Sequence, residues 1–245
     1  MEISILGNNG PFPSAGGACS GYLIRSEGIN LLIDCGNGVL ANLLKFIKIE
    51  ELDYVILTHL HSDHMSDLMV LRYAIDIKIK RGSLNKPLKV FSPDSPEEEY
   101  NRLNIKKVFE LKPIYEDTLM ELGNFRISFC EMKHPVRCYA VRIDSKNRSF
   151  VFSGDTAWNE KIIEFSKNAD IVMLDSGLLT KDKTDDNVPH LTARECGIIA
   201  RNCGAKRLLL THFWPEYNLI DILSEAKETF LGAELSEMFK TYIVT

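Results

Sequence analysis

Short runs of apolar residues recur along the chain at lengths typical of buried β-strands. The runs are rich in Val, Ile, Leu and Phe and are bounded by polar or turn-forming residues, which favours strands packed in a core. The predicted strands are Ile3–Leu6, Tyr22–Ile24, Leu31–Ile33, Tyr54–Leu57, Arg126–Cys130, Ala140–Ile143, Phe150–Phe152, Ile171–Leu174 and Leu208–Leu210.

Between some of these runs, apolar residues recur at three- and four-residue spacing, which predicts amphipathic helices. Thr192 and Glu195 also have the Thr-x-x-Glu spacing of a capping box, so a helix is expected to begin there. The predicted helices are Leu40–Ile47, Leu68–Ile79, Glu160–Ser166, Thr192–Asn202 and Ile220–Phe230. Two sheets packed face to face with helices outside would bury this pattern, although spacing alone leaves that arrangement open.

The composition is typical of a globular protein without a membrane-spanning segment. The chain has 245 residues, 45% of them hydrophobic, and no linker-like segment or repeat divides it, so residues 1–245 are expected to form a single domain. No signal peptide is evident at the start, and no apolar stretch approaches the ~18 residues of a membrane span. We therefore expect a cytoplasmic protein.

Charge and cysteine usage exclude other classes. The net charge of -5 argues against a broad basic surface and hence against long nucleic acid as a partner. The six cysteines have no C-x-x-C spacing, which argues against a cysteine zinc site and a disulfide framework. We interpret them as reduced and mostly buried thiols: Cys19, Cys35, Cys130, Cys138, Cys196 and Cys203.

Potential metal ligands follow the predicted strands, at the carboxyl ends where open sheets tend to place binding sites. The run Tyr54–Leu57 continues through Thr58 into an H-x-H-x-D-H segment at 59–64. Two further runs lead to Asp155 and His212, and a third is followed shortly by His134. The candidate ligands are His59, His61, Asp63, His64, His134, Asp155 and His212.

Imidazole and carboxylate ligands suit zinc, with manganese or iron as alternatives, and they argue against a soft thiolate site. His59 and His61 alternate and can point to one ion, whereas Asp63 and His64 lie past the turn and can point to another. We therefore expect two divalent ions. Two structural alternatives stay open: His134 could belong to a plain turn before Pro135, and Asp155 could cap a helix beginning near Thr156.

At this point the chain resembles the metallo-β-lactamase superfamily over nearly its whole length. The H-x-H-x-D-H segment, His134, Ser-Gly-Asp-Thr at 153–156 and Thr-His-Phe at 211–213 match that family's metal motifs in order. The resemblance implies an α/β fold: a four-layer αββα sandwich of two mixed β-sheets with helices on the outer faces. It further implies that His59, His61 and His134 bind one ion, that Asp63, His64 and His212 bind the other, and that Asp155 bridges them.

Within that family, Pro189-His190-Leu191-Thr192-Ala193 resembles the His-x-Thr motif of the ribonuclease Z-like phosphodiesterase branch. The resemblance implies that His190 acts as a general acid; a helix-entry residue without chemistry is the alternative. A glutamate orients this histidine in the branch, and the aligned residue here is Asp175, whose shorter side chain leaves that contact open. Relatives in the branch are often homodimers, which we expect here by analogy.

The chain lacks room for the long arm that holds tRNA in ribonuclease Z, because only 20 residues separate His134 from Asp155. Asp67-Leu68, where glyoxalase and lactonase relatives usually carry glycine, also resembles the short phosphodiesterase-like members. The favoured hypothesis is a metal-dependent phosphodiesterase for a small phosphodiester, such as a cyclic nucleotide or cyclic sugar phosphate.

In the proposed reaction a hydroxide shared by two ions attacks the phosphodiester, Asp63 orients it or accepts its proton, and His190 protonates the leaving alkoxide. Three alternatives remain: a lactone, thioester or other carbonyl-ester hydrolase of the same fold, a tRNA 3′-end endonuclease, and a metal-bound interaction module without turnover.

Three further segments carry weaker signals. The glycine-rich segment 7–17 could approach a substrate phosphate, although a plain surface loop is the favoured interpretation. The basic residues Lys78, Lys80, Arg81, Lys86 and Lys89 could line an entrance, although a solvated face is the commoner outcome. Lys181–Asp186 is a candidate lid, with an ordinary exposed loop as the alternative.

Overall fold

Two seven-stranded mixed sheets form the centre of the protein in the computed structural model, which describes residues 1–186 and 188–245. The first sheet has the order β14 (Thr241–Ile243), β1 (Glu2–Gly7), β2 (Gly21–Ser26), β3 (Ile29–Ile33), β4 (Tyr54–Ile56), β5 (Leu88–Ser92) and β6 (Phe109–Pro113). The second has the order β13 (Ala233–Leu235), β12 (Arg207–Thr211), β11 (Ile171–Asp175), β10 (Arg148–Phe152), β9 (Tyr139–Ser145), β8 (Phe125–Glu131) and β7 (Leu119–Leu122).

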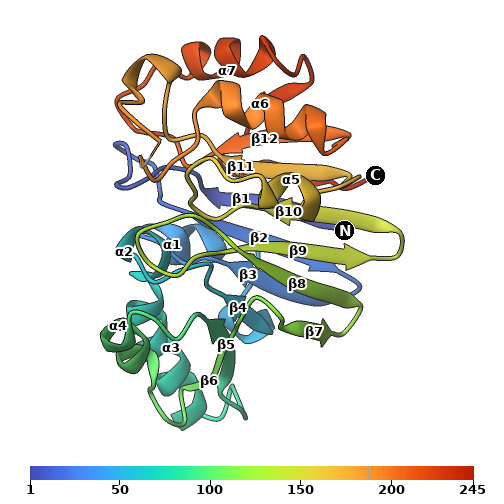
Figure 1. The fold of residues 1–245 in the computed structure, drawn as a ribbon. Coiled ribbons are helices and arrows are strands. Elements are labelled where there is room, and N and C mark those ends of the chain that lie inside the picture. Colours follow the sequence, from blue (N-terminus) through green and yellow to red (C-terminus); the bar gives the residue numbers. More distant parts are fainter. Residues whose placement is uncertain (187) are drawn as a thin grey trace.

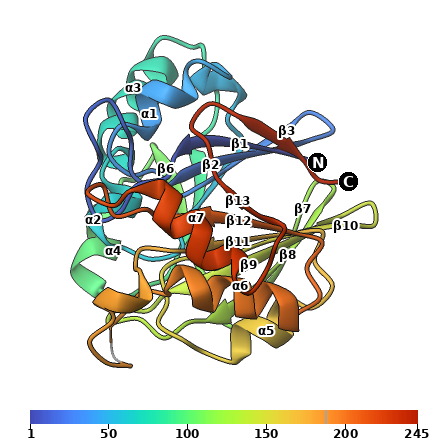
Figure 2. The ribbon, with the colours of Figure 1, turned by 90° about the horizontal axis from the view of Figure 1, so that it is seen from above.

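Helices cover the outer face of each sheet. The remaining elements are α1 (Val39–Leu43), η1 (Ile49–Glu51), α2 (Ser62–Met65), α3 (Leu68–Lys80), α4 (Glu97–Leu103), α5 (Lys161–Phe165), η2 (Thr180–Asp182), α6 (Ala193–Asn202) and α7 (Leu219–Lys227). Figure 2 shows α1 and α3 on one side of the two sheets and α5 and α6 on the other, and α7 packs against α6. The predicted αββα sandwich is confirmed.

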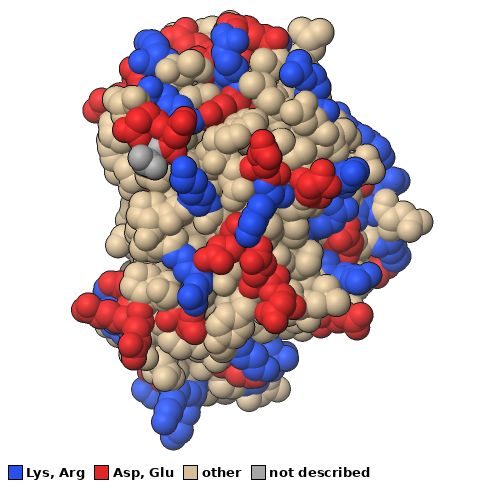
Figure 3. Space-filling model, viewed as in Figure 1, with Lys and Arg blue, Asp and Glu red and all other residues tan. Residues whose placement is uncertain are grey.

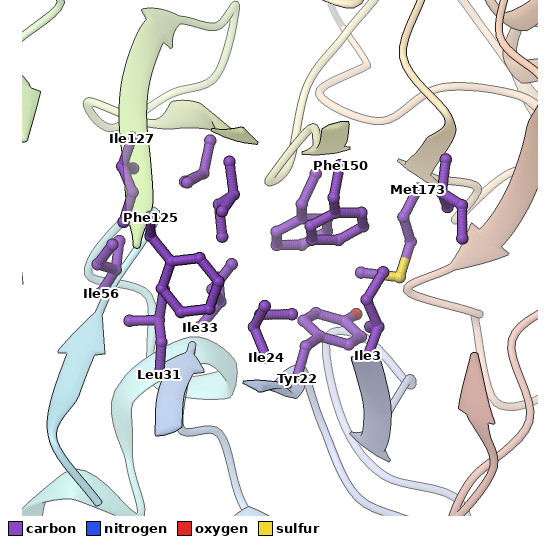
Figure 4. Close-up of a cluster of buried hydrophobic side chains, with 14 of the residues drawn as sticks. Ile3, Tyr22, Ile24, Leu31, Ile33, Ile56, Phe125, Ile127, Phe150 and Met173 are labelled. Carbon is purple, nitrogen blue, oxygen red and sulfur yellow. The ribbon is translucent and has the colours of Figure 1, made fainter. Parts of the chain in front are cut away.

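The apolar faces of the two sheets meet in a common core (Figure 4). Ile24 and Leu31 from the first sheet face Phe125 and Phe150 from the second, and all four side chains are buried. Two further apolar clusters lie between each sheet and its helices. Strands buried on both faces explain why the central runs are apolar almost throughout instead of alternating.

Both sheets combine antiparallel and parallel pairing in the same way. In the first sheet the pairs from β14 to β3 are antiparallel and the pairs from β3 to β6 are parallel. In the second sheet the pairs from β7 to β10 are antiparallel and the pairs from β10 to β13 are parallel. The parallel strands place their carboxyl ends at one edge of each sheet. That edge carries α2 and lies at the end of the molecule opposite the two chain termini (Figures 1 and 2).

The short and peripheral strands were not predicted. β5, β6, β7, β13 and β14 are absent from the predicted set, because most of them are edge or near-edge strands that are short or carry charged residues. The predicted helix Leu40–Ile47 is too long: α1 ends at Leu43, and three-residue turns follow, with Lys45 N donating to Asn42 O. The charged helix α4 was also missed, since it has little apolar periodicity.

Among the described residues, no helix is long and apolar enough to cross a membrane. Acidic and basic residues are interspersed on the face shown in Figure 3, with no broad basic area there. Two of the five residues of the predicted basic run form ion pairs: Lys78 contacts Glu50, and Lys80 contacts Asp76. All six cysteines are free and buried, as predicted.

Candidate metal centre

The carboxyl ends of parallel strands bring the predicted ligands to one place. β4 leads through Thr58 into His59, β10 leads through Ser153 and Gly154 into Asp155, and β12 leads directly into His212. The turn after His61 forms α2, which carries Asp63 and His64. His134, in the connection between β8 and β9, completes the set. The structure therefore gathers every predicted ligand.

His59, His61 and His134 form the first group. Nε2 of His59 lies 3.2 Å from Nδ1 of His61, which lies 3.1 Å from Nε2 of His134. A single proton on Nδ1 of His61 can serve only one of these neighbours, so hydrogen bonds alone do not satisfy the group. Burial lowers the pKa of all three rings, which favours the neutral form that binds a metal.

Asp63, His64, Asp155 and His212 form the second group. Oδ2 of Asp63 lies 3.2 Å from Nε2 of His212, and Nε2 of His64 lies 3.3 Å from the same nitrogen. The grouping of side chains is the one that the family resemblance implies for two ions. The assignment of each residue as a ligand stays a prediction.

Asp155, a member of the second group, also lies close to the first group and is almost fully buried. Its Oδ2 is 3.7 Å from Nε2 of His59 in the first group and 3.4 Å from Nε2 of His212 in the second. Its Oδ1 lies 3.3 Å from Nε2 of His64, but it makes no well-formed hydrogen bond with the described residues. Burial alone would raise the pKa of Asp155, but the rings of His212 and His64 outweigh it and hold the pKa well below its usual range.

These observations fit divalent cations. Zinc bound tetrahedrally about 2.0–2.1 Å from each nitrogen would hold its ligands roughly 3.3 Å apart, close to the spacings of the histidine group. A buried carboxylate among imidazole nitrogens, with one oxygen that makes no well-formed hydrogen bond, is costly without a cation. The backbone agrees with this interpretation, because His212 has a left-handed φ of 59°, a sparsely populated conformation for a non-glycine residue that occurs in tight turns and at active sites.

His190 lies beside both groups. Its ring stacks on His212 with centroids 5.1 Å apart and meets His134 edge to face at 5.9 Å. Nδ1 of His190 lies 2.8 Å from Oδ2 of Asp175. Asp175, although shorter than the glutamate that the family resemblance implies at this position, therefore reaches His190. Burial lowers the pKa of His190, but the Asp175 carboxylate outweighs it, so the pKa lies above its usual value.

Comparison with known proteins identifies the family. Residues 29–213 match the family model for the beta-lactamase superfamily domain. The chain belongs to the metallo-β-lactamase superfamily. It is 34% identical to the probable metallo-hydrolase YhfI of Bacillus subtilis (strain 168) over 233 residues, covering 95% of each chain. The crystal structure of YhfI matches it with a TM-score of 0.94, 32% identity and 98% coverage of both chains.

One further relative bears on the branch, and one solved structure bears on the fold. A ribonuclease Z from Brevibacillus brevis is 25% identical, with 97% of this chain and 95% of the relative covered. The crystal structure of the human tRNase Z short form has the same fold, with a TM-score of 0.80 at 20% identity and full coverage of both chains. The protein is thus a metallo-hydrolase of this superfamily and belongs to its ribonuclease Z-like branch.

Asp34 is a site residue that the sequence pattern did not single out. It directly follows β3, has a left-handed φ of 57°, and is fully buried. Its Oδ2 lies 2.7 Å from Nδ1 of His64, and its Oδ1 accepts a hydrogen bond from the backbone N–H of Thr58. Such a carboxylate orients a metal-binding ring and raises its basicity. The signal available in the sequence was an aspartate at the end of an apolar strand, the same pattern that predicted Asp155.

Asp175 supports the second group as well as His190. Its Oδ1 lies 3.4 Å from Nδ1 of His212, while Oδ2 lies 3.2 Å from the backbone nitrogen of Thr156. No helix begins at Thr156, so the alternative of Asp155 as a helix cap is wrong. The predicted capping box is confirmed, since Thr192 accepts from Glu195 N and the Glu195 carboxylate accepts from Thr192 N.

The glycine-rich segment after β1 is partly buried against the centre, so its interpretation as a plain surface loop is wrong for residues 8–10. Gly10 N donates to Phe213 O, and Phe213 N donates to Asn8 O. A Cβ on Gly10 would lie 1.9 Å from Nε2 of His212, which shows why this position excludes a side chain. The backbone at Gly10 therefore borders the candidate centre.

The predicted lid segment Lys181–Asp186 is attached to the body of the protein at several points. Lys183 pairs with Glu195, Asp182 accepts a hydrogen bond from Tyr217, and Lys133 donates to the carbonyl of Asp186. These contacts do not test a lid function, which stays a prediction. The contact with Lys133 connects this segment to the residue that precedes His134.

Proposed function

We propose that this metallo-hydrolase cleaves a small phosphodiester. The observation that carries the proposal is His190, held by Asp175 beside both groups of candidate ligands. A histidine in this place can protonate a departing alkoxide, which phosphodiester cleavage requires at neutral pH. The relationship to ribonuclease Z, whose name denotes cleavage of a phosphodiester backbone, supports the same class.

Each ion-binding group has a proposed ligand set. His59, His61 and His134 would hold one divalent ion, Asp63, His64 and His212 the second, and Asp155 both. Zinc suits this set of nitrogen and oxygen donors best, with manganese or iron as alternatives. Bound there, two such ions would supply Lewis acidity and a lowered pKa of water, as in other two-metal hydrolases.

The protein's own residues would handle the protons. Nδ1 of His190 is engaged by Asp175, which leaves Nε2 as the nitrogen able to donate to the leaving oxygen. Asp63 is only partly buried, with its side chain 11% exposed, so its carboxylate can orient the attacking water or accept its proton. Asp63 would thus act on the attacking water, and His190 would act on the leaving oxygen.

The segment between His134 and Asp155 favours a small substrate. It is filled by β9 and β10, joined by a tight hairpin in which Lys146 and Asn147 have φ values of 48° and 61°. No arm is inserted there. The alignment with ribonuclease Z spans 304 positions, more than the 245 residues of this chain, so the relative has segments that this chain lacks.

A matched pair of substrates tests the proposed class. Bis(p-nitrophenyl) phosphate and p-nitrophenyl acetate release the same leaving group, so their comparison isolates the phosphoryl centre from the acyl centre. With metal content measured, we expect kcat/KM for the diester to exceed that for the ester by at least about ten-fold, a difference of ~1.4 kcal/mol in transition-state stabilisation. A lactone is expected to be a poor substrate, and a tRNA precursor with a 3′ trailer is expected to stay uncut.

The opposite preference would assign the protein to the carbonyl-ester hydrolases of this fold. Cleavage of the 3′ trailer would instead support the alternative of a tRNA 3′-end endonuclease. A fully metal-loaded protein that hydrolyses none of these compounds would support an interaction module without turnover.

A further inference from the structure

Two aromatic side chains meet each other on loops that flank the candidate metal centre. Phe12 lies in the loop after β1, and Trp214 lies in the loop after β12. Their rings are 5.3 Å apart between centroids with an interplanar angle of 78°. Phe12 is 42% exposed, although it contacts another aromatic ring. An edge-to-face pair covers only one face of one ring and leaves the remaining faces able to stack on a third planar group.

The backbone contacts of both loops place this pair beside His212. Gly10 borders Nε2 of His212, and Phe12 follows two residues later. Trp214 is two residues beyond His212. Because each residue of extended chain spans at most about 3.6 Å, both Cα atoms lie within roughly 7 Å of residues that form or border the centre. The loop after β1, dark blue in Figures 1 and 2, lies at the same end of the molecule as α2.

The hydrogen bonds between the two loops hold the pair in place. The carbonyl of Asn8 accepts a hydrogen bond from Phe213 N, and Gly10 N donates to the carbonyl of Phe213. Asn9, between them, forms β-bridges with both Cys19 and Phe213. The side chain of Asn9 also accepts bonds from the backbone and hydroxyl of Ser14, beyond Phe12. Phe12 is therefore presented by a loop anchored on both sides. A fixed, exposed aromatic ring is well suited to stacking, because little side-chain freedom is lost on binding.

We propose that Phe12 and Trp214 form a stacking platform for a nucleobase, so that the substrate is a nucleoside phosphodiester and not a base-free cyclic sugar phosphate. This proposal rests on the proposed function, since it names the group attached to the scissile phosphate. A nucleoside phosphate carries its base one sugar ring away from phosphorus. The platform would hold the base while the phosphate lies between the two groups of candidate ligands.

Binding to the metal-loaded protein tests the platform without requiring turnover. The chain has two tryptophans, so Trp158→Phe leaves Trp214 as the only indole reporter. In this background we expect adenosine 5′-monophosphate to quench Trp214 fluorescence and to bind at least about ten-fold more tightly than ribose 5-phosphate. Adding Phe12→Leu, which keeps apolar bulk but removes the π-face, should weaken the adenosine 5′-monophosphate complex roughly 5- to 100-fold and change ribose 5-phosphate binding less than about two-fold.

Tyr73→Leu is the matched control, because Tyr73 is an exposed aromatic residue on α3, 58% accessible, outside the site. It should leave both affinities unchanged. Equal affinity for the two phosphates, no binding of either, or indifference of adenosine 5′-monophosphate binding to Phe12→Leu would overturn the platform. If the platform is found but no phosphodiester is hydrolysed, the proposed reaction fails while the base site stands. If the diester is hydrolysed but the base contributes nothing, only the platform fails.

Discussion

Asp155→Asn is expected to lose bound metal and nearly all hydrolytic activity together. The asparagine keeps the size of the side chain but removes the negative charge that lies between the two groups, 3.4 Å from His212 and 3.7 Å from His59. Because that carboxylate is proposed to bind both ions, its loss should lower occupancy at both positions. We expect less than half of the wild-type metal content by elemental analysis and a fall in kcat/KM on the order of 10³-fold or more.

Asp170→Asn provides a matched control for this substitution. Asp170 is also buried, but it lies just before β11, at the end of the strand away from the centre, where it pairs with Lys206 and accepts from Ser149. It should retain two ions. Equal metal occupancy in Asp155→Asn and the wild-type protein would rule out the proposed bridging role.

His190→Ala is expected to reduce turnover without reducing metal content. Its ring stacks on His212, meets His134 edge to face and lies 4.0 Å from Oδ2 of Asp155, while its hydrogen bond is to Asp175. Loss of a general acid typically lowers the rate by about 10²–10⁴-fold. That loss should appear with a diester whose leaving group is an alkoxide, and it should be much smaller with bis(p-nitrophenyl) phosphate, because p-nitrophenolate leaves readily without a proton.

Measuring kcat for both diesters in the wild-type and variant proteins separates an acid from a positioning residue. A residue that only shapes the site would slow the two substrates by the same factor. Such a result, or a loss of metal in His190→Ala, would contradict the proposed role of proton donor.

Much of the centre was predictable because several candidate ligands follow apolar strands. His59, Asp155 and His212 follow apolar runs after one or two residues, and parallel strands end on the same side of a sheet, which determines where these residues meet. Asp34 was missed because its contact with His64 depends on the register between β3 and β4, in which Ile33 pairs with Ile56. That long-range register is not encoded in a local pattern.

The contact of Asp175 illustrates a second limit of local patterns. Side-chain length alone left the contact with His190 open, yet Asp175 pairs in register with Thr211, beside His212, and thereby reaches both histidines. The aromatic pair was also missed, since Phe12 and Trp214 are brought together only by the pairing of two distant loops. The single domain, a homodimer and a cytoplasmic location stay predictions from the sequence.

Removal and stepwise return of metal tests the central claim most directly. The wild-type protein is stripped with a chelator, and bis(p-nitrophenyl) phosphate hydrolysis is followed as zinc is added back in measured equivalents. We expect no hydrolysis without metal and a rise that ends near two ions per chain, as the two groups of ligands require. Full activity in the stripped protein, or saturation at a single ion per chain, would contradict a hydrolase built on this pair of sites.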